Sequence, residues 1–109
     1  MNPVQVIGDA DTVLAFALGG VPGRIVHSAA EAEAAVAGVV RDVRRGGGPV
    51  RAPALVLVPH RTAGLIRQYL ARVMLDASGP LVLEIPGFGE PLGQRPLHRF
   101  VQRALGVRP

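Results

Sequence analysis

The sequence predicts an α/β protein: a small Rossmann-like or receiver-like parallel sheet of four strands, with helices on both faces and a further amphipathic helix at the C-terminus. Two observations predict this class. Four short apolar runs alternate with three longer segments in which apolar residues recur every three or four positions. Each of these segments is long enough for a right-handed crossover helix, which is the usual connection between parallel strands.

The first strand is expected over residues 4–7, and a tight turn leads from it into a helix. Asp11 or Thr12 caps this helix, because a side-chain oxygen at that place accepts a hydrogen bond from one of the free N–H groups of the first turn. The helix runs to about Leu18, where two glycines follow as a stop signal.

The second strand is expected over residues 24–27. Ser28 and Glu31 then form a capping box, in which the two side chains satisfy free N–H groups at the start of a helix. This predicts a helix over residues 28–45. Its apolar positions keep helical spacing and are Ala32, Ala35, Val36, Val39, Val40 and Val43.

A flexible loop is expected over residues 46–53, followed by a third strand at 54–58. This strand is apolar throughout, which is typical of strands buried on both faces. One continuous helix is expected over 61–75, and the fourth strand over 81–85. The apolar side of that helix consists of Leu65, Ile66, Tyr69, Leu70, Val73 and Met74.

The pattern divides the chain into an α/β domain at 1–86, a flexible connector at 87–94, and an amphipathic helix with a short tail at 95–109. A helix of about a dozen residues is marginal alone in water, so it must dock on something. The surface belongs either to this chain, as for a cover helix, or to a helical groove of a partner. The apolar stripe consists of Leu97, Phe100, Val101, Ala104 and Leu105, and the polar face of His98, Arg99, Gln102 and Arg103.

Composition excludes several classes of site. The chain has 109 residues, no cysteine, and 12 basic side chains that are all arginine. Disulfides, thiolate metal sites, a P-loop lysine and a Schiff-base lysine are therefore excluded, and the missing cysteine fits a cytosolic protein. We expect neither a membrane span nor a signal peptide, because no apolar run reaches the required length or follows a basic N-terminal segment.

The formal net charge of +4 raises the question of nucleic-acid binding. The arginines are scattered apart from a cluster within 41–45, and only four aromatic side chains are available for base stacking. We therefore interpret the positive charge as a solvated surface and expect no nucleic-acid partner.

Asp9 and Asp11 follow the first strand, and the carboxyl ends of strands are where open parallel sheets bind ligands. If the strand order is 2-1-3-4, these acids face Pro59 and His60 across one crevice. An acidic pair at this place suggests the metal pocket of a response-regulator receiver. However, the third strand ends in Val-Pro-His where the phosphoacceptor carboxylate is needed, and no lysine is present to sense the phosphate.

The structural interpretation of the same stretch assigns Gly8, Asp9, Asp11 and Thr12 to a turn and helix cap, with both acids near the positive N-terminal end of the helix. We prefer this interpretation. The alternative is a receiver-like or metal-binding regulatory domain that uses the crevice of Asp9 and Asp11, joined by His60.

The remaining candidates are weaker. No G-x-G-x-x-G follows the first strand, so a dinucleotide site is not expected. His27, His60 and His98 are too far apart in the sequence for metal ligands on one element. Glu84 is a solitary carboxylate in an apolar strand, and we expect an arginine partner or an exposed strand end there. The sequence therefore predicts no catalytic residues, no metal and no cofactor.

Three stretches in register resemble one known family: VIGDADTVLAFALGGV at 6–21, PLVLEIPG at 80–87 and LHRFVQRALGV at 97–107. They are similar to the F subunit of the V-type (A/V-type) ATP synthase, whose motifs read approximately V-I-G-D-x-D-T-V-x-G-F-x-L-A-G-V, I-L-E-I-P and V-K-R-A-I/L-G-V. One departure is Pro59, which stands where a serine or threonine often caps the third helix in that family.

The resemblance implies a non-catalytic rotor subunit in the central stalk, cytoplasmic and peripheral to a membrane-bound complex. In this family the C-terminal helix packs on the coiled coil of the D subunit, and the resulting shaft turns inside the catalytic A/B hexamer and drives the membrane rotor. ATP synthesis or hydrolysis, and the coupled proton or sodium transport, would then occur on other chains.

Carried over from the resemblance, the stripe from Leu97 to Leu105 becomes the contact surface for that coiled coil. The resemblance also implies that Arg99 and Arg103 would flank the stripe and pair with acids of the D subunit. An adaptor domain whose tail binds an unrelated helical partner is a third hypothesis.

Overall fold

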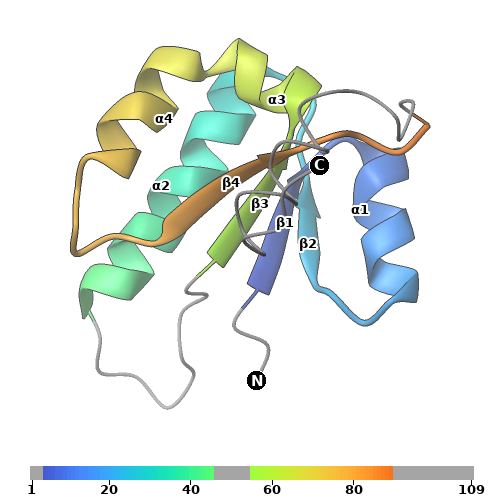
Figure 1. Ribbon diagram of the computed structural model, residues 1–109, viewed down its shortest axis with the longest axis horizontal. Helices are drawn as coiled ribbons and strands as arrows, with labels where there is room; N and C mark the ends of the chain where they lie inside the picture. Colours follow the sequence, from blue (N-terminus) through green and yellow to red (C-terminus); the bar gives the residue numbers. More distant parts are fainter. Residues whose placement is uncertain (1–3, 46–54, 90–109) are drawn as a thin grey trace, which may run out of the picture.

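The computed structural model describes residues 4–45 and 55–89, and these residues contain the predicted four-stranded parallel sheet (Figure 1). The strand order is β2-β1-β3-β4, the order considered above for the crevice. The second strand ends two residues earlier than expected, at Ile25. The strands are β1 (Val4–Gly8), β2 (Gly23–Ile25), β3 (Leu55–Pro59) and β4 (Leu81–Ile85).

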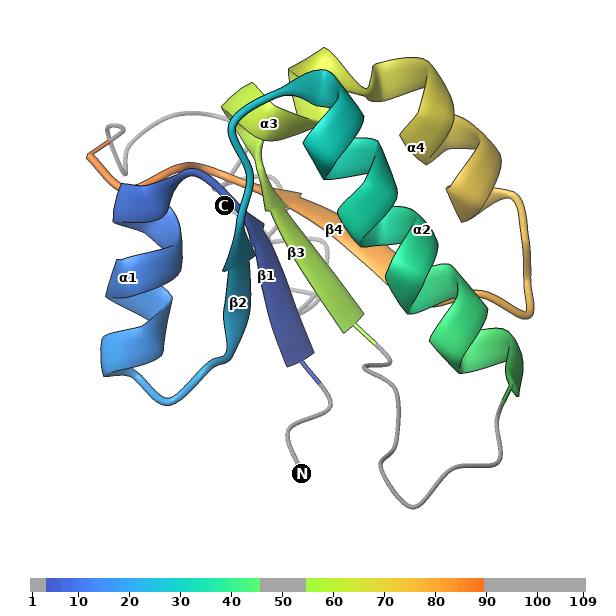
Figure 2. The ribbon, with the colours of Figure 1, turned by 180° about the vertical axis from the view of Figure 1, so that it is seen from behind.

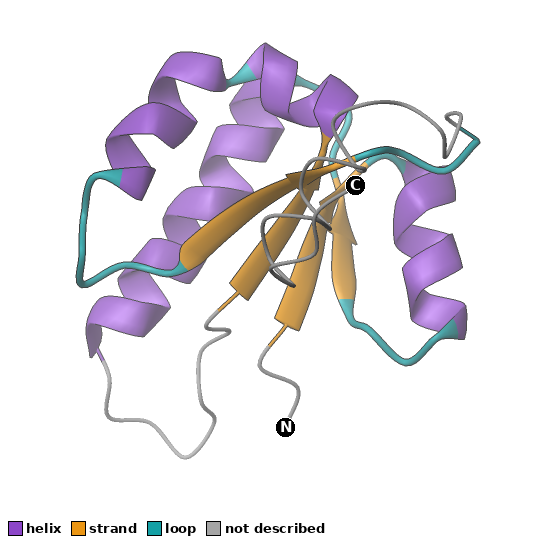
Figure 3. Ribbon diagram, in the orientation of Figure 1, coloured by secondary structure: helices purple, strands orange, loops and turns teal. Residues whose placement is uncertain are grey.

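Helices lie on both faces of this sheet, in three layers (Figures 2 and 3). Each right-handed crossover that moves along the sheet in one direction places its helix on the same face. The first connection leads from β1 out to the β2 edge, whereas the later two lead toward the β4 edge, so among the described helices the first is the only one on its face. The helices are α1 (Ala10–Leu18), α2 (Ala29–Arg45), α3 (His60–Leu65) and α4 (Arg67–Met74).

The main core lies between the sheet and the layer of α2, α3 and α4. Ile7, Val56 and Val58 supply the sheet side of this core and have no exposed surface. The helices complete it with short aliphatic side chains at the predicted helical spacing. These helical core residues are Ala32, Ala35, Val36, Val39, Ala63, Ile66, Leu70 and Val73.

The expectation that β3 is buried on both faces is only half correct. Val56 and Val58 are fully buried against the helices, whereas Leu55 and Leu57 on the opposite face keep part of their surface exposed. The reason is that α1 packs mainly on β1 and β2. An uninterrupted apolar run therefore indicated a parallel strand, but not how completely each face of it is covered.

The single helix expected over 61–75 is wrong, because the chain breaks it into α3 and α4 at Ile66. The backbone of Ile66 leaves the helical region, with φ −130° and ψ 33°, while its side chain is buried in the core. The break lets α3 lie at the carboxyl end of the sheet and α4 run back beside α2 (Figure 1). It also changes which side chains face inward, so that Leu65 and Met74 are 57% and 52% exposed.

The carboxyl ends of β1 and β3 approach each other closely at Gly8. A Cβ atom added to Gly8 would lie 2.5 Å from Cγ and 2.6 Å from Cδ of Pro59, distances at which atoms overlap. Pro59 is itself fully buried, so it has little room to move.

We expect Gly8→Ala to lower the free energy of unfolding by about 1–3 kcal/mol, because the added methyl group overpacks this contact. Urea unfolding followed by circular dichroism measures the change. Gly64→Ala is the control, since a Cβ there meets nothing within 4 Å. A helical glycine replaced by alanine should leave stability unchanged or raise it by up to ~1 kcal/mol. Equal effects of the two substitutions would contradict the close approach at Gly8.

Candidate functional site

The turn after β1 is built around the carboxylate of Asp9, which caps α1. Asp9 has an extended backbone, with φ −69° and ψ 162°, and its Oδ2 accepts a hydrogen bond from the backbone N–H of Thr12 at 3.0 Å. The hydroxyl of Thr12 donates to the same carboxylate, 2.9 Å from Oδ1. The predicted cap at Asp11 or Thr12 is therefore wrong, because the helix begins earlier than that assignment requires.

Asp11 lies in the first turn of α1, exposed to solvent. A negative charge there interacts favourably with the positive end of the helix dipole, as the structural interpretation of this stretch expected. His60 was expected to face Asp11 across a crevice, but its Nδ1 instead contacts the carboxylate of Glu84.

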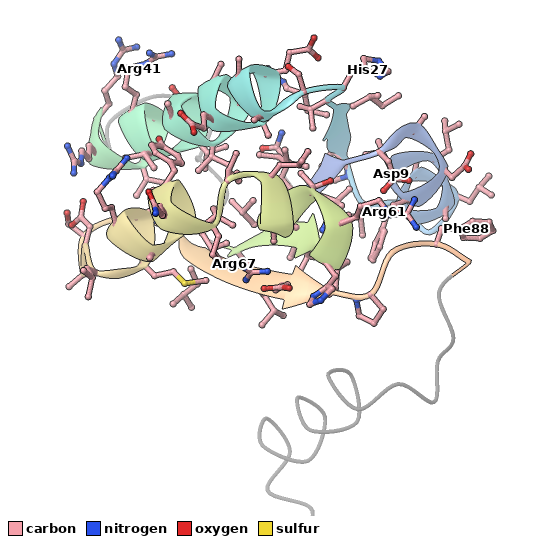
Figure 4. The ribbon with its side chains drawn as sticks, turned by 90° about the horizontal axis from the view of Figure 1, so that it is seen from above. Asp9, His27, Arg41, Arg61, Arg67 and Phe88 are labelled. Carbon is pink, nitrogen blue, oxygen red and sulfur yellow. The ribbon has the colours of Figure 1, made fainter. Side chains whose placement is uncertain are left out.

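The pKa of Asp9 is shifted by its environment. Burial raises the pKa of its carboxyl group, but the hydrogen bonds from the backbone and side chain of Thr12 and the charge of Arg61 together lower the pKa below the ordinary value of 3.8. The carboxylate is therefore ionised at neutral pH, which strengthens its hydrogen bonds as a helix cap. In Figure 4, Asp9 and Arg61 lie next to each other at this end of the sheet.

Thr12 connects α1 to the segment that follows β4. Thr12 is 1% exposed, and its Oγ1 accepts a hydrogen bond from the N–H of Phe88 at 2.9 Å. The hydroxyl of Thr12 thus donates to Asp9 and accepts from Phe88. These two hydrogen bonds use the hydroxyl's O–H donor and one of its two lone pairs. An open groove of about 460 Å³ lies beside this contact, lined by Thr12, Ala15, Phe16, Pro86, Gly87, Phe88 and Gly89.

His60 and Glu84 form a second polar cluster, together with Arg67. The guanidinium of Arg67 donates two hydrogen bonds to the Glu84 carboxylate, the longer one at 3.2 Å, and Nδ1 of His60 contacts the same carboxylate. The hydrogen bond from Arg67 lowers the pKa of Glu84 despite partial burial, and the charges of Arg67 and His60 lower it further. The arginine partner predicted for Glu84 is therefore confirmed.

This cluster replaces the grouping of His60 with Asp9 and Asp11 that the receiver-like alternative required, and that grouping is wrong. The three side chains do not converge, because His60 begins α3 and turns to β4. Within residues 4–45 and 55–89, no group of three or more histidine, cysteine, aspartate or glutamate side chains is placed to hold a metal ion. The acidic crevice on which the receiver-like alternative depends is thus divided between a helix cap and a surface ion cluster.

The capping box of α2 is present. The N–H of Glu31 donates to Oγ of Ser28 at 3.1 Å, and the Glu31 carboxylate accepts from the N–H of His27 at 3.0 Å. The Glu31 carboxylate thus accepts from the residue before the cap, His27, and not from Ser28 itself. Pro59 precedes α3 without a side-chain cap, as its lack of a side-chain oxygen indicated.

Sequence reasoning missed the ion pair between Arg44 and Asp76. It joins the end of α2 to the turn between α4 and β4. Hydrogen bonds from Arg44 and Ser78 lower the pKa of Asp76 to about 2. The two residues are 32 positions apart, and neither the charge of Arg44 nor the turn composition around Asp76 identifies the other partner.

The predicted contact stripe lies outside the described residues. This holds for Leu97, Arg99, Phe100, Val101, Arg103, Ala104 and Leu105, whose roles stay predictions. In the part of the chain that the structure describes, none of the helices has the length and apolarity needed to cross a membrane.

Comparison with known proteins identifies relatives of this chain. Residues 4–101 match the family of the ATP synthase (F/14-kDa) subunit. The chain is also 28% identical to the F subunit of the A-type ATP synthase of Methanothermobacter thermautotrophicus over 107 residues, which cover 95% of this chain and 92% of that protein. The matched region includes the α/β domain and part of the predicted C-terminal stripe.

We expect Asp9→Ala to lower the free energy of unfolding at pH 7 by about 1 kcal/mol, since the cap of α1 is lost, whereas Asp9→Asn retains most of it. Because the pKa of Asp9 is lowered in the folded state, its ionised form contributes stability above pH 3.8, and this contribution is lost as pH falls through the folded pKa. Chemical unfolding of wild type and Asp9→Asn from pH 7 to pH 2 should show a loss specific to the wild type. Parallel curves would contradict this role of the carboxylate.

We expect Thr12→Val to expose the N–H of Phe88 to exchange, because the isosteric side chain cannot accept its hydrogen bond. Loss of one net hydrogen bond predicts a rise of roughly tenfold in the amide exchange rate of Phe88, measured by NMR. Thr12→Ser keeps the hydroxyl and should keep the protection. An unchanged rate in Thr12→Val would show that this contact does not hold the segment.

Proposed function

We propose that this chain is the non-catalytic F subunit in the central stalk of a V-type or A-type ATP synthase, because it belongs to the family of the ATP synthase (F/14-kDa) subunit. In this role it binds the coiled coil of the D subunit to help transmit rotation between the catalytic A/B hexamer and the membrane rotor. That rotation is coupled to ATP synthesis or hydrolysis and to proton or sodium transport. The protein lies on the cytoplasmic side, as a peripheral part of the membrane-bound complex, without inserting into the bilayer or binding nucleic acid.

The observation that carries this proposal is the extent of the family match. It begins at the first residue of β1 and continues to residue 101, past the end of the α/β domain. A chance likeness between parallel α/β domains would be confined to the sheet and its crossovers. The match therefore supports a function in which the domain and the C-terminal segment act together.

The chemistry of the sheet's carboxyl end supports a structural function as well. The carboxylate of Asp9 is engaged by Thr12, and that of Glu84 by Arg67 and His60. Groups that position a helix and a segment of chain suit a protein that transmits force, since such a protein needs fixed geometry. The proposed contact stripe would add affinity through burial of its apolar side chains, at ~25 cal/mol per Å² before the costs of association.

We expect Phe100→Asp to abolish the complex with the D subunit, because it places a charge in the middle of the proposed apolar stripe. Co-expression of both proteins, followed by affinity purification of the tagged partner, measures the stoichiometry of the complex. His98→Asp is the matched control: it introduces the same negative charge on the proposed polar face and should leave the complex intact.

We expect circular dichroism of the isolated protein to show both variants folded, since both positions follow the predicted α/β domain of residues 1–86 in the sequence. If wild-type protein does not co-purify with the D subunit, the proposed function is wrong. If Phe100→Asp and His98→Asp bind equally well, the stripe is not the contact surface.

A further inference from the structure

The outward face of α1 is apolar, unlike the outward face of α2. Leu14 is 57% exposed and Leu18 is 93% exposed, and the two lie one turn apart on the same face. Asp11 precedes them in the same row and is the acidic residue of the first turn. By contrast, α2 presents glutamates at its start and arginines at its end to solvent, as a helix with one buried face normally does.

Single exposed leucines are common on protein surfaces, but an aligned pair on a short helix that already buries its other side is less ordinary. The buried side of α1 consists of Thr12 and Val13. Leu14 and Leu18 therefore cannot serve the core, and the helix is apolar on both sides. A helix with apolar side chains on more than one side is typically buried rather than left facing solvent.

We propose that Asp11, Leu14 and Leu18 form a second contact surface for the coiled coil of the D subunit. This surface binds an apolar stripe on a helix of the partner, next to a basic side chain of that helix. This inference rests on the proposed function, because it assigns a further surface to the same partner. A second copy of this chain is the less suitable occupant: a stable interface needs about 800 Å² and roughly 20–30 residues from each partner. A row of three side chains on one short helix supplies only a small part of that, so it fits a supplementary contact.

The position of α1 makes a shared partner geometrically possible. The hydrogen bond from Phe88 to Thr12 holds the start of the C-terminal segment against α1, and Figure 4 shows Phe88 at that side of the molecule. Gly89 and Leu97 are eight positions apart in the sequence. Eight residues span at most roughly 30 Å when fully extended. A partner helix of about 20 residues covers the same length, so one long helix can reach both surfaces.

The acid sets the charge expected on the partner. No ion pair of Asp11 is found among the described residues, and Asp9 behind it is already engaged by Thr12. An arginine or lysine of the partner next to the leucine contact would pair with Asp11. Exposed pairs of this kind chiefly affect association rate and salt dependence.

The test compares two double variants of matched exposure. Leu14→Gln with Leu18→Gln removes the proposed contact, whereas Leu65→Gln with Leu75→Gln alters leucines that are 57% and 86% exposed on α3 and at the end of α4. We expect the first pair to raise the Kd for the purified D subunit by tenfold or more, measured by isothermal titration calorimetry, and the second to leave it within twofold. Both should melt at the wild-type temperature, because none of the four side chains belongs to the core.

The outcomes separate this inference from the proposed function. If wild type and both double variants bind the D subunit equally well while Phe100→Asp does not, the α1 surface is wrong and the proposed function stands. If both double variants weaken binding equally, the effect is not specific to α1 and the inference is again wrong. If wild type fails to bind, the proposed function and this inference fall together.

The charge of the surface is tested separately. Asp11→Asn should raise the Kd at low salt but not at high salt, because exposed charges are screened as the ionic strength rises. An unchanged Kd at low salt would exclude the basic partner residue.

Discussion

The handedness of the crossovers is the constraint on which the rest of this structure depends. With strand order β2-β1-β3-β4, the connection to the β2 edge and the two connections toward the β4 edge place their helices on opposite faces of the sheet. The larger core therefore forms with α2, α3 and α4, and α1 is the only helix within residues 4–45 and 55–89 that lies on the other face. The features that distinguish this domain follow from that asymmetry: the apolar outer side of α1, the partly exposed leucines of β3, and the groove beside Phe88.

The fold could be predicted from the sequence because the period of its apolar residues is regular. Four short runs and three helical segments predict a parallel sheet with right-handed crossovers, whereas the strand order 2-1-3-4 entered only as a condition. The capping box of Ser28 and Glu31 was also predictable, because it depends only on residues three positions apart. The family resemblance also rested on short stretches of consecutive residues. The match of residues 4–101 to the family of the ATP synthase (F/14-kDa) subunit confirms this resemblance.

What the sequence did not reveal depends on contacts between distant residues. The side chain of Ile66 is buried in the core, and its backbone leaves the helical region to place it there. The spacing of apolar residues does not show such a break. The receiver-like alternative placed His60 beside Asp9 and Asp11, whereas Asp9 is engaged by Thr12 and His60 contacts Glu84 on the neighbouring strand. The helix cap was misplaced within a run of three candidates that all carry suitable oxygens. The role of Thr12 toward Phe88 joins residues 76 positions apart and needed the fold to be seen.

The hydrogen bond between Thr12 and Phe88 also determines how a mechanical pull on the C-terminal segment enters the domain. Among the described strands β4 lies at the edge and pairs with β3 alone, and a force applied at its carboxyl end would peel this ladder one hydrogen bond after another. Because Phe88 is tied to α1, the force first meets a helix that packs on β1, an interior strand paired on both sides. The ladder between β4 and β3 is thereby shielded, and tension is carried into the middle of the domain.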